Sequence, residues 1–147
     1  EHQGLWLSDA PLATWMGVGV DQKEPNFVTE LRLVDRGMVG EIPEVITKLI
    51  SLELLDLSQN KLEGMLPTAF SSLGKLSTLC VAGNNLSGEV STLAALSEMK
   101  HIDLSNNQFS GPISSAILQL HNLEMLKMKG NKLTGTVPTE MFKAEHL

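Results

Sequence analysis

A motif of about 24 residues recurs five times along this chain and constrains its fold more than any other feature. The copies share the pattern L-x-L-x-x-N-x-L-x-G-x-(I/L/V)-P and begin at Leu31, Leu55, Leu79, Ile102 and Leu126. The asparagine position holds Arg36 in the first copy, and in the others Asn60, Asn84, Asn107 and Asn131. So many shared positions predict a solenoid, in which each coil contacts only its neighbours.

The chemistry of the motif predicts what each coil contains. The L-x-L alternation is typical of a short strand with one buried face, and stacked coils would form a parallel sheet. Segments such as EVITKLISL and TAFSSLGKL carry apolar residues at helical spacing over fewer than ten residues, so we expect short helical or 3-10 turns on the convex side. The asparagine amide both donates and accepts, which predicts a structural ladder along the strand ends.

The two ends depart from the repeat. Residues 1–27 hold Trp6, Trp15 and Phe27 and are predicted to form an N-terminal cap, because large aromatic side chains suit the cover of an exposed core. Residues 28–147 hold the five repeats, and Leu147 aligns with Leu76, the first leucine of a strand. We therefore expect a fragment that stops as a sixth repeat begins, its C-terminal end covered by further repeats or by a partner.

The repeat pattern resembles the plant-specific class of leucine-rich repeats over residues 28–147. The resemblance implies an α/β solenoid, a right-handed superhelix with a parallel sheet on the concave face and a second small sheet beside it. ATWMGVGVD followed by VTELRL is similar to the cap of the same family, with Ala13 and Val20 where the family has two cysteines.

Members of that class bind peptides, small hormones or other proteins, and include receptor-like kinase ectodomains and polygalacturonase inhibitors. The resemblance implies a protein or peptide partner and an extracellular or membrane-attached protein. The missing cap cysteines argue against a disulfide-stapled, secreted cap, so the sequence leaves the compartment open.

Composition excludes several other classes. The formal net charge of −6 argues against a nucleic-acid partner, which requires clustered Lys and Arg. No apolar run reaches the roughly 20 residues of a membrane helix, so no membrane segment is expected in these residues. The four histidines share no metal-ligand spacing and no phosphate-binding glycine loop follows a strand, so no metal and no cofactor are expected.

The concave face is the predicted binding surface, because its side chains are not used by the core. Two positions on each strand point outward and give the candidate residues Glu30, Arg32, Leu54, Asp56, Thr78, Cys80, His101, Asp103, Met125 and Lys127. This set contains no Trp, Tyr or Phe, and aromatic residues dominate tight interfaces, so a tight interface on these strands alone is not expected.

Catalytic interpretations of the same face are weak. Asp56 and Asp103 would lie roughly 10 Å apart on an open sheet, without the cleft that paired glycosidase carboxylates need. Cys80 and His101 fall on adjacent strands, but nothing supplies an oxyanion hole or an orienting third group. No catalytic residues are predicted.

The leading hypothesis is a non-enzymatic binding module, the recognition segment of a longer receptor-like or inhibitor-like protein. The alternative is a structural or assembly subunit whose open end packs against another protein. Asn85-Leu86-Ser87 forms one glycosylation sequon, at a turn after a strand.

Overall fold

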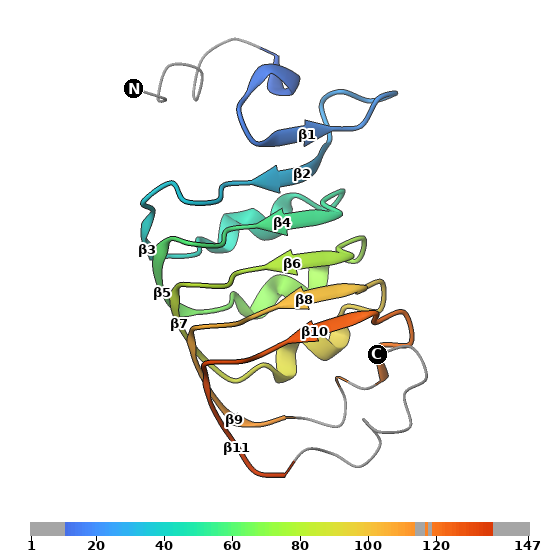
Figure 1. The fold of residues 1–147 in the computed structure, drawn as a ribbon. Helices are drawn as coiled ribbons and strands as arrows, with labels where there is room; N and C mark the ends of the chain where they lie inside the picture. Colours follow the sequence, from blue (N-terminus) through green and yellow to red (C-terminus); the bar gives the residue numbers. More distant parts are fainter. Residues whose placement is uncertain (1–10, 114–116, 118, 137–147) are drawn as a thin grey trace.

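The repeats coil into a solenoid with a parallel sheet on one face and short 3-10 helices on the opposite face (Figure 1). The computed structural model describes residues 11–113, 117 and 119–136. The predicted α/β solenoid is confirmed by this arrangement. Within the described residues no helix has the length and apolar character that a bilayer crossing requires.

Within the described residues the concave sheet has six strands, one from each of the five repeats and one, β1, from the segment before them. In spatial order they are β1 (Val18–Val20), β2 (Val28–Arg32), β4 (Leu54–Asp56), β6 (Thr78–Cys80), β8 (His101–Asp103) and β10 (Met125–Lys127). From β2 to β10 neighbouring strands are parallel and without register slips. Equivalent residues of successive repeats therefore lie side by side.

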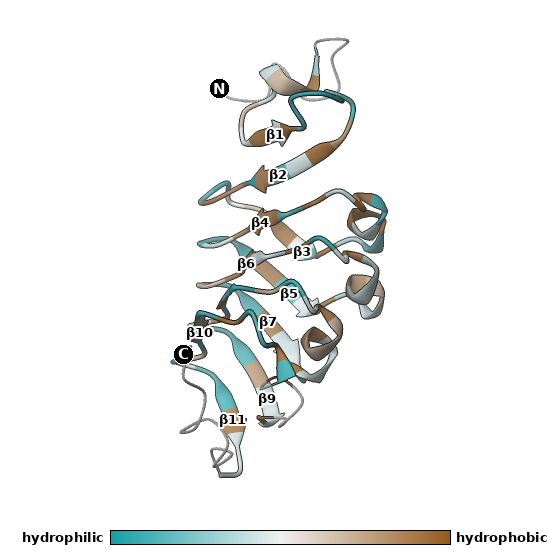
Figure 2. Ribbon diagram, turned by 90° about the vertical axis from the view of Figure 1, so that its right-hand side faces the viewer, coloured by the Kyte–Doolittle hydropathy of each residue, from teal (hydrophilic) through white to brown (hydrophobic). Residues whose placement is uncertain are grey.

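A second sheet runs along one flank of the solenoid and is built from the glycine-containing half of each repeat. Its strands are β3 (Val39–Glu41), β5 (Lys61–Met65), β7 (Asn85–Gly88), β9 (Gln108–Pro112) and β11 (Lys132–Thr134). Figure 2 shows this sheet facing the viewer, between the edge of the concave sheet and the 3-10 helices. It is the small sheet that the family resemblance implied.

On the convex side of the described part of the chain, 3-10 helices stack on one another, among them η2 (Glu44–Lys48), η3 (Thr68–Ser72) and η4 (Ser91–Ala95). Pro43 and Pro67 precede the first two, and their restricted φ sets the chain direction into each helix. The third repeat is one residue shorter. Ser91 stands where the first, second and fifth repeats have proline, and the fourth repeat has Ser114 at the same position. The structure absorbs the missing residue here, because η4 begins at Ser91 itself.

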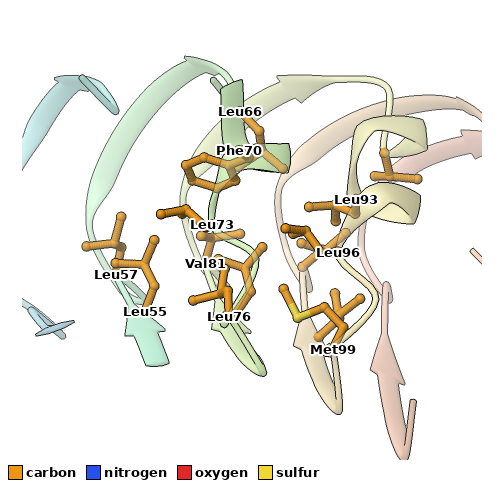
Figure 3. Close-up of a cluster of buried hydrophobic side chains, with 14 of the residues drawn as sticks. Leu55, Leu57, Leu66, Phe70, Leu73, Leu76, Val81, Leu93, Leu96 and Met99 are labelled. Atoms are coloured by element: carbon orange, nitrogen blue, oxygen red, sulfur yellow. The ribbon is translucent and has the colours of Figure 1, made fainter. Parts of the chain in front are cut away.

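The core is a continuous column of side chains shared between coils (Figure 3). Leu55, Leu79 and Ile102 point inward from the concave strands and are fully buried. Phe70, on η3, fills the space between the sheets and the convex helices and is also fully buried. Burying one such side chain contributes about 1.5–3 kcal/mol, so the stacked coils hold together through their shared interior.

An additional strand joins the cap to the first repeat, and the sequence did not predict it. β1 pairs antiparallel with β2, after the short helix η1 (Leu12–Thr14). Gly17 makes this approach possible, because its φ of +85° is left-handed and a Cβ there would collide with the carbonyl oxygen of Arg32. β1 thus covers the free edge of β2 with hydrogen-bonded backbone.

Candidate binding surface on the concave sheet

The ten predicted concave residues form two straight columns across the sheet. In the first column Glu30 pairs with Leu54, which pairs with Thr78, His101 and Met125 in turn. The second column runs through Arg32, Asp56, Cys80, Asp103 and Lys127 in the same register. All ten side chains are partly or fully exposed, so both columns face solvent.

The charges of the second column are arranged symmetrically about its centre. Asp56 and Asp103 lie on either side of Cys80, with Arg32 and Lys127 at the two ends. Lys127 Nζ lies 3.8 Å from Asp103 Oδ2, and Arg32 Nε lies 3.0 Å from Glu30 Oε2. The side chains of Arg32 and Lys127 are more than half exposed, so these ion pairs stabilise the fold little and remain available to a ligand.

The aspartates are oriented by hydroxyl residues two positions further along each strand end. Asp56 Oδ1 accepts hydrogen bonds from the Ser58 amide at 3.0 Å and from Ser58 Oγ at 2.5 Å. Asp103 Oδ1 accepts from the Ser105 amide at 3.0 Å. Our sequence reasoning missed these contacts, although the recurring D-x-S spacing could have indicated them. Each aspartate therefore holds one oxygen against its own strand end.

The environment of Cys80 does not activate its thiol as a nucleophile. Burial raises the pKa of the Cys80 thiol, and the negative charges of Asp56 and Asp103 raise it further. Catalysis by a thiol requires the thiolate, which this environment disfavours. In the register His101 lies beside Thr78 rather than Cys80, and its Nε2 is 3.4 Å from Glu124 Oε2. The thiol and the imidazole are therefore not arranged as a catalytic pair.

The asparagine column lies beneath the concave face, where each side chain joins two coils. Asn84 Oδ1 accepts from the Leu62 amide of the preceding coil at 2.9 Å, and its Nδ2 donates to Leu57 O and Val81 O. The same pattern recurs at Asn60, Asn107 and Asn131.

Each asparagine side chain of the ladder bonds backbone groups of the preceding coil. The first repeat has no preceding coil, so an asparagine there would lack these partners. Arg36 stands in the asparagine slot of that repeat, and its own backbone amide donates to Asn60 Oδ1 at 2.9 Å. The ladder therefore needs no asparagine at this position. The asparagine ladder also holds the concave strands in a constant register, which keeps the two columns straight.

A different kind of surface lies beside the first repeat. The described residues line two adjoining apolar hollows there, one of about 550 Å³ that includes Phe27 and Ile50 and one of about 380 Å³ that includes Met38 and Val45. Val45 and Ile50 are about 60% exposed, and Val39 on the edge strand β3 is 73% exposed. This flank could bury apolar area against another molecule.

Sequence comparisons match the repeats to known proteins. Models of the leucine-rich repeat match residues 28–86 and residues 98–120. A probable inactive receptor kinase of Arabidopsis thaliana is 34% identical over 87 residues, which are 58% of this chain and 13% of that protein. The chain thus spans a small part of the curated relatives it matches.

Solved structures match over most of the chain. A chain in the crystal structure of the BIR3–SERK2 complex from Arabidopsis thaliana superimposes with a TM-score of 0.86 at 34% identity, covering 95% of this chain and 75% of that one. The plant peptide hormone receptor RGFR1, solved in complex with RGF2, superimposes with a TM-score of 0.71 at 33% identity, covering 74% of this chain and 18% of that one.

Proposed function

Because this chain belongs to the plant-type leucine-rich repeat family, we propose that its concave sheet is a recognition surface for a peptide or protein and that the chain itself catalyses no reaction. The observation that carries this proposal is the pair of straight columns described above, whose side chains are not used by the core. In the same proposal residues 1–27 act as the cap and residues 28–147 as the repeats that bear the surface.

The dimensions of the sheet suit an extended peptide. Five parallel strands at about 4.8 Å spacing extend about 19 Å, which an extended peptide of about six residues spans. A peptide lying across the strands would pass over either column, where each strand presents one side chain. The solved complex of RGFR1 with RGF2 supports this by analogy, since that similar structure is a peptide hormone receptor with its ligand.

The chemistry of the columns predicts how such a ligand binds. The face offers charges of both signs, one histidine and small or aliphatic side chains, but no Trp, Tyr or Phe. Aromatic and arginine anchors usually supply most of the affinity of an interface. We therefore expect recognition by polar complementarity and weak affinity for these five strands alone. This fits the recognition segment of a longer receptor-like or inhibitor-like protein, given that the chain spans 13% of its receptor kinase relative.

The single cysteine of the chain allows a direct test. Cys80 lies at the centre of the second column, so a ligand over the concave face should shield its thiol from alkylation. Peptides enriched from a displayed random library on the immobilised protein would serve as probes, and the rate of Cys80 alkylation by iodoacetamide would be measured with and without each peptide. We expect the bound peptides to slow the reaction severalfold.

A matched control places the thiol on the opposite face. In the double variant Cys80→Ser, Ser71→Cys the thiol sits on η3 at an exposed position. The same peptides should leave its alkylation rate unchanged. Failure to enrich any peptide, or peptides that shield the convex thiol and not Cys80, would overturn the proposal.

The apolar flank of the first repeat favours the alternative, an assembly subunit. Val45 and Ile50 are exposed there and line the two apolar hollows. Light scattering after size exclusion distinguishes the two functions. Association that is lost on Val45→Glu would support assembly through this flank, whereas a monomer at high concentration would count against it.

A further inference from the structure

We propose that Asn85 is an acceptor for an N-linked glycan, carried on the outer face of the second sheet and clear of the concave columns. The proposal is independent of what the concave face binds. Asn85-Leu86-Ser87 is the single N-x-S/T sequon without proline in the 147 residues. The asparagine-rich repeat motif can produce such a triplet without any glycan, so the positions of the side chains in the structure are what support the site.

Two adjacent asparagines have opposite environments at this point of the chain. Asn84 is buried, 6% exposed, and its amide is fully engaged in the ladder. Asn85 is the first residue of β7 and is exposed. Its side-chain amide makes no hydrogen bond to the described part of the chain. A folded coil therefore has no room for a sugar on Asn84, whereas on Asn85 the sugar would extend into solvent.

The strand geometry completes the acceptor. Side chains alternate along β7, so Asn85 and Ser87 share the outer face while Leu86 is fully buried between them. Ser87 Oγ donates to the Gly64 carbonyl oxygen at 3.1 Å and lies flat against the neighbouring strand. The residue beside Asn85 in the register is Glu63, which is itself exposed. A glycan at this position meets no apolar surface that the fold needs.

The modification is a simple group transfer. Asn85 Nδ2 loses a proton and forms a bond to C1 of an oligosaccharide, and the pyrophosphate-linked lipid that carries the sugar leaves. The donor is thus a lipid-pyrophosphate oligosaccharide, which the chain meets if it enters a secretory compartment.

A glycan here would divide the molecule into two faces. β7 is the middle strand of the second sheet, on the flank turned toward the viewer in Figure 2. A bulky, hydrated sugar on that flank would keep protein partners away from it. The concave sheet, which is turned edge-on in the same view, would stay open.

The test is the mass of the chain after secretion. We would express it behind a cleavable secretion signal in eukaryotic cells and compare its mass before and after treatment with peptide N-glycosidase. The wild-type chain should carry the mass of one oligosaccharide, and release should leave aspartate at position 85. Asn85→Gln and Ser87→Ala should both lack the added mass, and Ser87→Thr should retain it.

Asn122 supplies the matched control, because it is exposed and lies outside any sequon. Asn122→Gln should carry the same glycan as the wild-type chain. A secreted wild-type chain of unmodified mass would overturn the proposal, and so would added mass that persists in Asn85→Gln. Peptide mapping of the wild-type chain locates the site even if a variant fails to be secreted.

Discussion

Asn84 joins three backbone groups of two neighbouring coils, and its replacement by alanine measures what one rung of the ladder contributes. The side chain is buried, and its Oδ1 accepts from the Leu62 amide at 2.9 Å. Its Nδ2 donates to Leu57 O and Val81 O, each at 3.0 Å. Asn84→Ala removes all three hydrogen bonds without changing the backbone.

The three groups are not left in the same state. Leu57 O still accepts from Asn60 Nδ2 at 2.9 Å, and Val81 O still accepts from Asn107 Nδ2 at 2.9 Å. The Leu62 amide loses its acceptor and remains buried. An orphaned buried N–H costs about 1–3 kcal/mol, and each of the other two lost bonds about 0.5–1.5 kcal/mol. We therefore expect the free energy of unfolding to fall by about 4 kcal/mol.

Urea titration followed by far-ultraviolet circular dichroism measures this loss by linear extrapolation. Asn85→Ala is the matched control, because the side chain of this neighbouring asparagine is exposed and makes no hydrogen bond to the described residues. It should change the free energy of unfolding by less than about 0.5 kcal/mol.

A second substitution at position 84 tests the hydrogen-bond donors of the side chain separately from its size and shape. Asn84→Asp keeps the size of the side chain and one acceptor oxygen, but turns a second oxygen toward two carbonyl groups in a buried site. It should destabilise the chain at least as much as alanine. A loss of less than about 1 kcal/mol for Asn84→Ala, or full tolerance of aspartate, would refute the reasoning.

Three further predictions follow from single side chains. Phe70→Ala should lower the free energy of unfolding by about 3–5 kcal/mol in the same titration, because Phe70 is fully buried. Phe70→Leu leaves a smaller cavity and should lower it clearly less, so equal losses for the two variants would contradict this reasoning. Gly88→Ala should lower the free energy of unfolding by about 1–2 kcal/mol, because φ at this position is +89° and the new Cβ would lie 2.9 Å from Met65 Cγ. The Tm should fall accordingly, and an unchanged Tm would argue against strain at this position. Burial and the two aspartates raise the pKa of Cys80, so alkylation should be slower in the folded chain than in urea and should rise with pH. Asp56→Asn should shift this pH–rate profile to lower pH, and an unchanged profile would show that the carboxylate does not act on the thiol.

Much of the fold and the position of the candidate site could be predicted from the repeat alone. Each motif position meets the same environment in every coil, so five copies report the same constraint five times. The inward leucines and the two outward columns follow from strand alternation, and no knowledge of the neighbouring coils is needed. Asn84 belongs to this class, because an amide in a leucine-rich strand end requires partners wherever it is buried.

Other features depend on contacts between segments that share no pattern. The strand β1 pairs with β2 because Gly17 admits the backbone of Arg32, and neither the cap motif nor the repeat motif indicates that these two residues meet. The pKa of Cys80 is raised by the burial of the thiol and also by carboxylates from two other repeats.

The sequence by itself determined the coil, the register of the columns and the residues that face outward, since these are local properties repeated at fixed spacing. Only the tertiary structure decided which side chains meet across coils, how the third repeat absorbs its missing residue, and which backbone groups of the preceding coil the Asn84 side chain bonds. Those outcomes depend on distances between residues more than 20 positions apart, and such distances exist only once the coils are stacked.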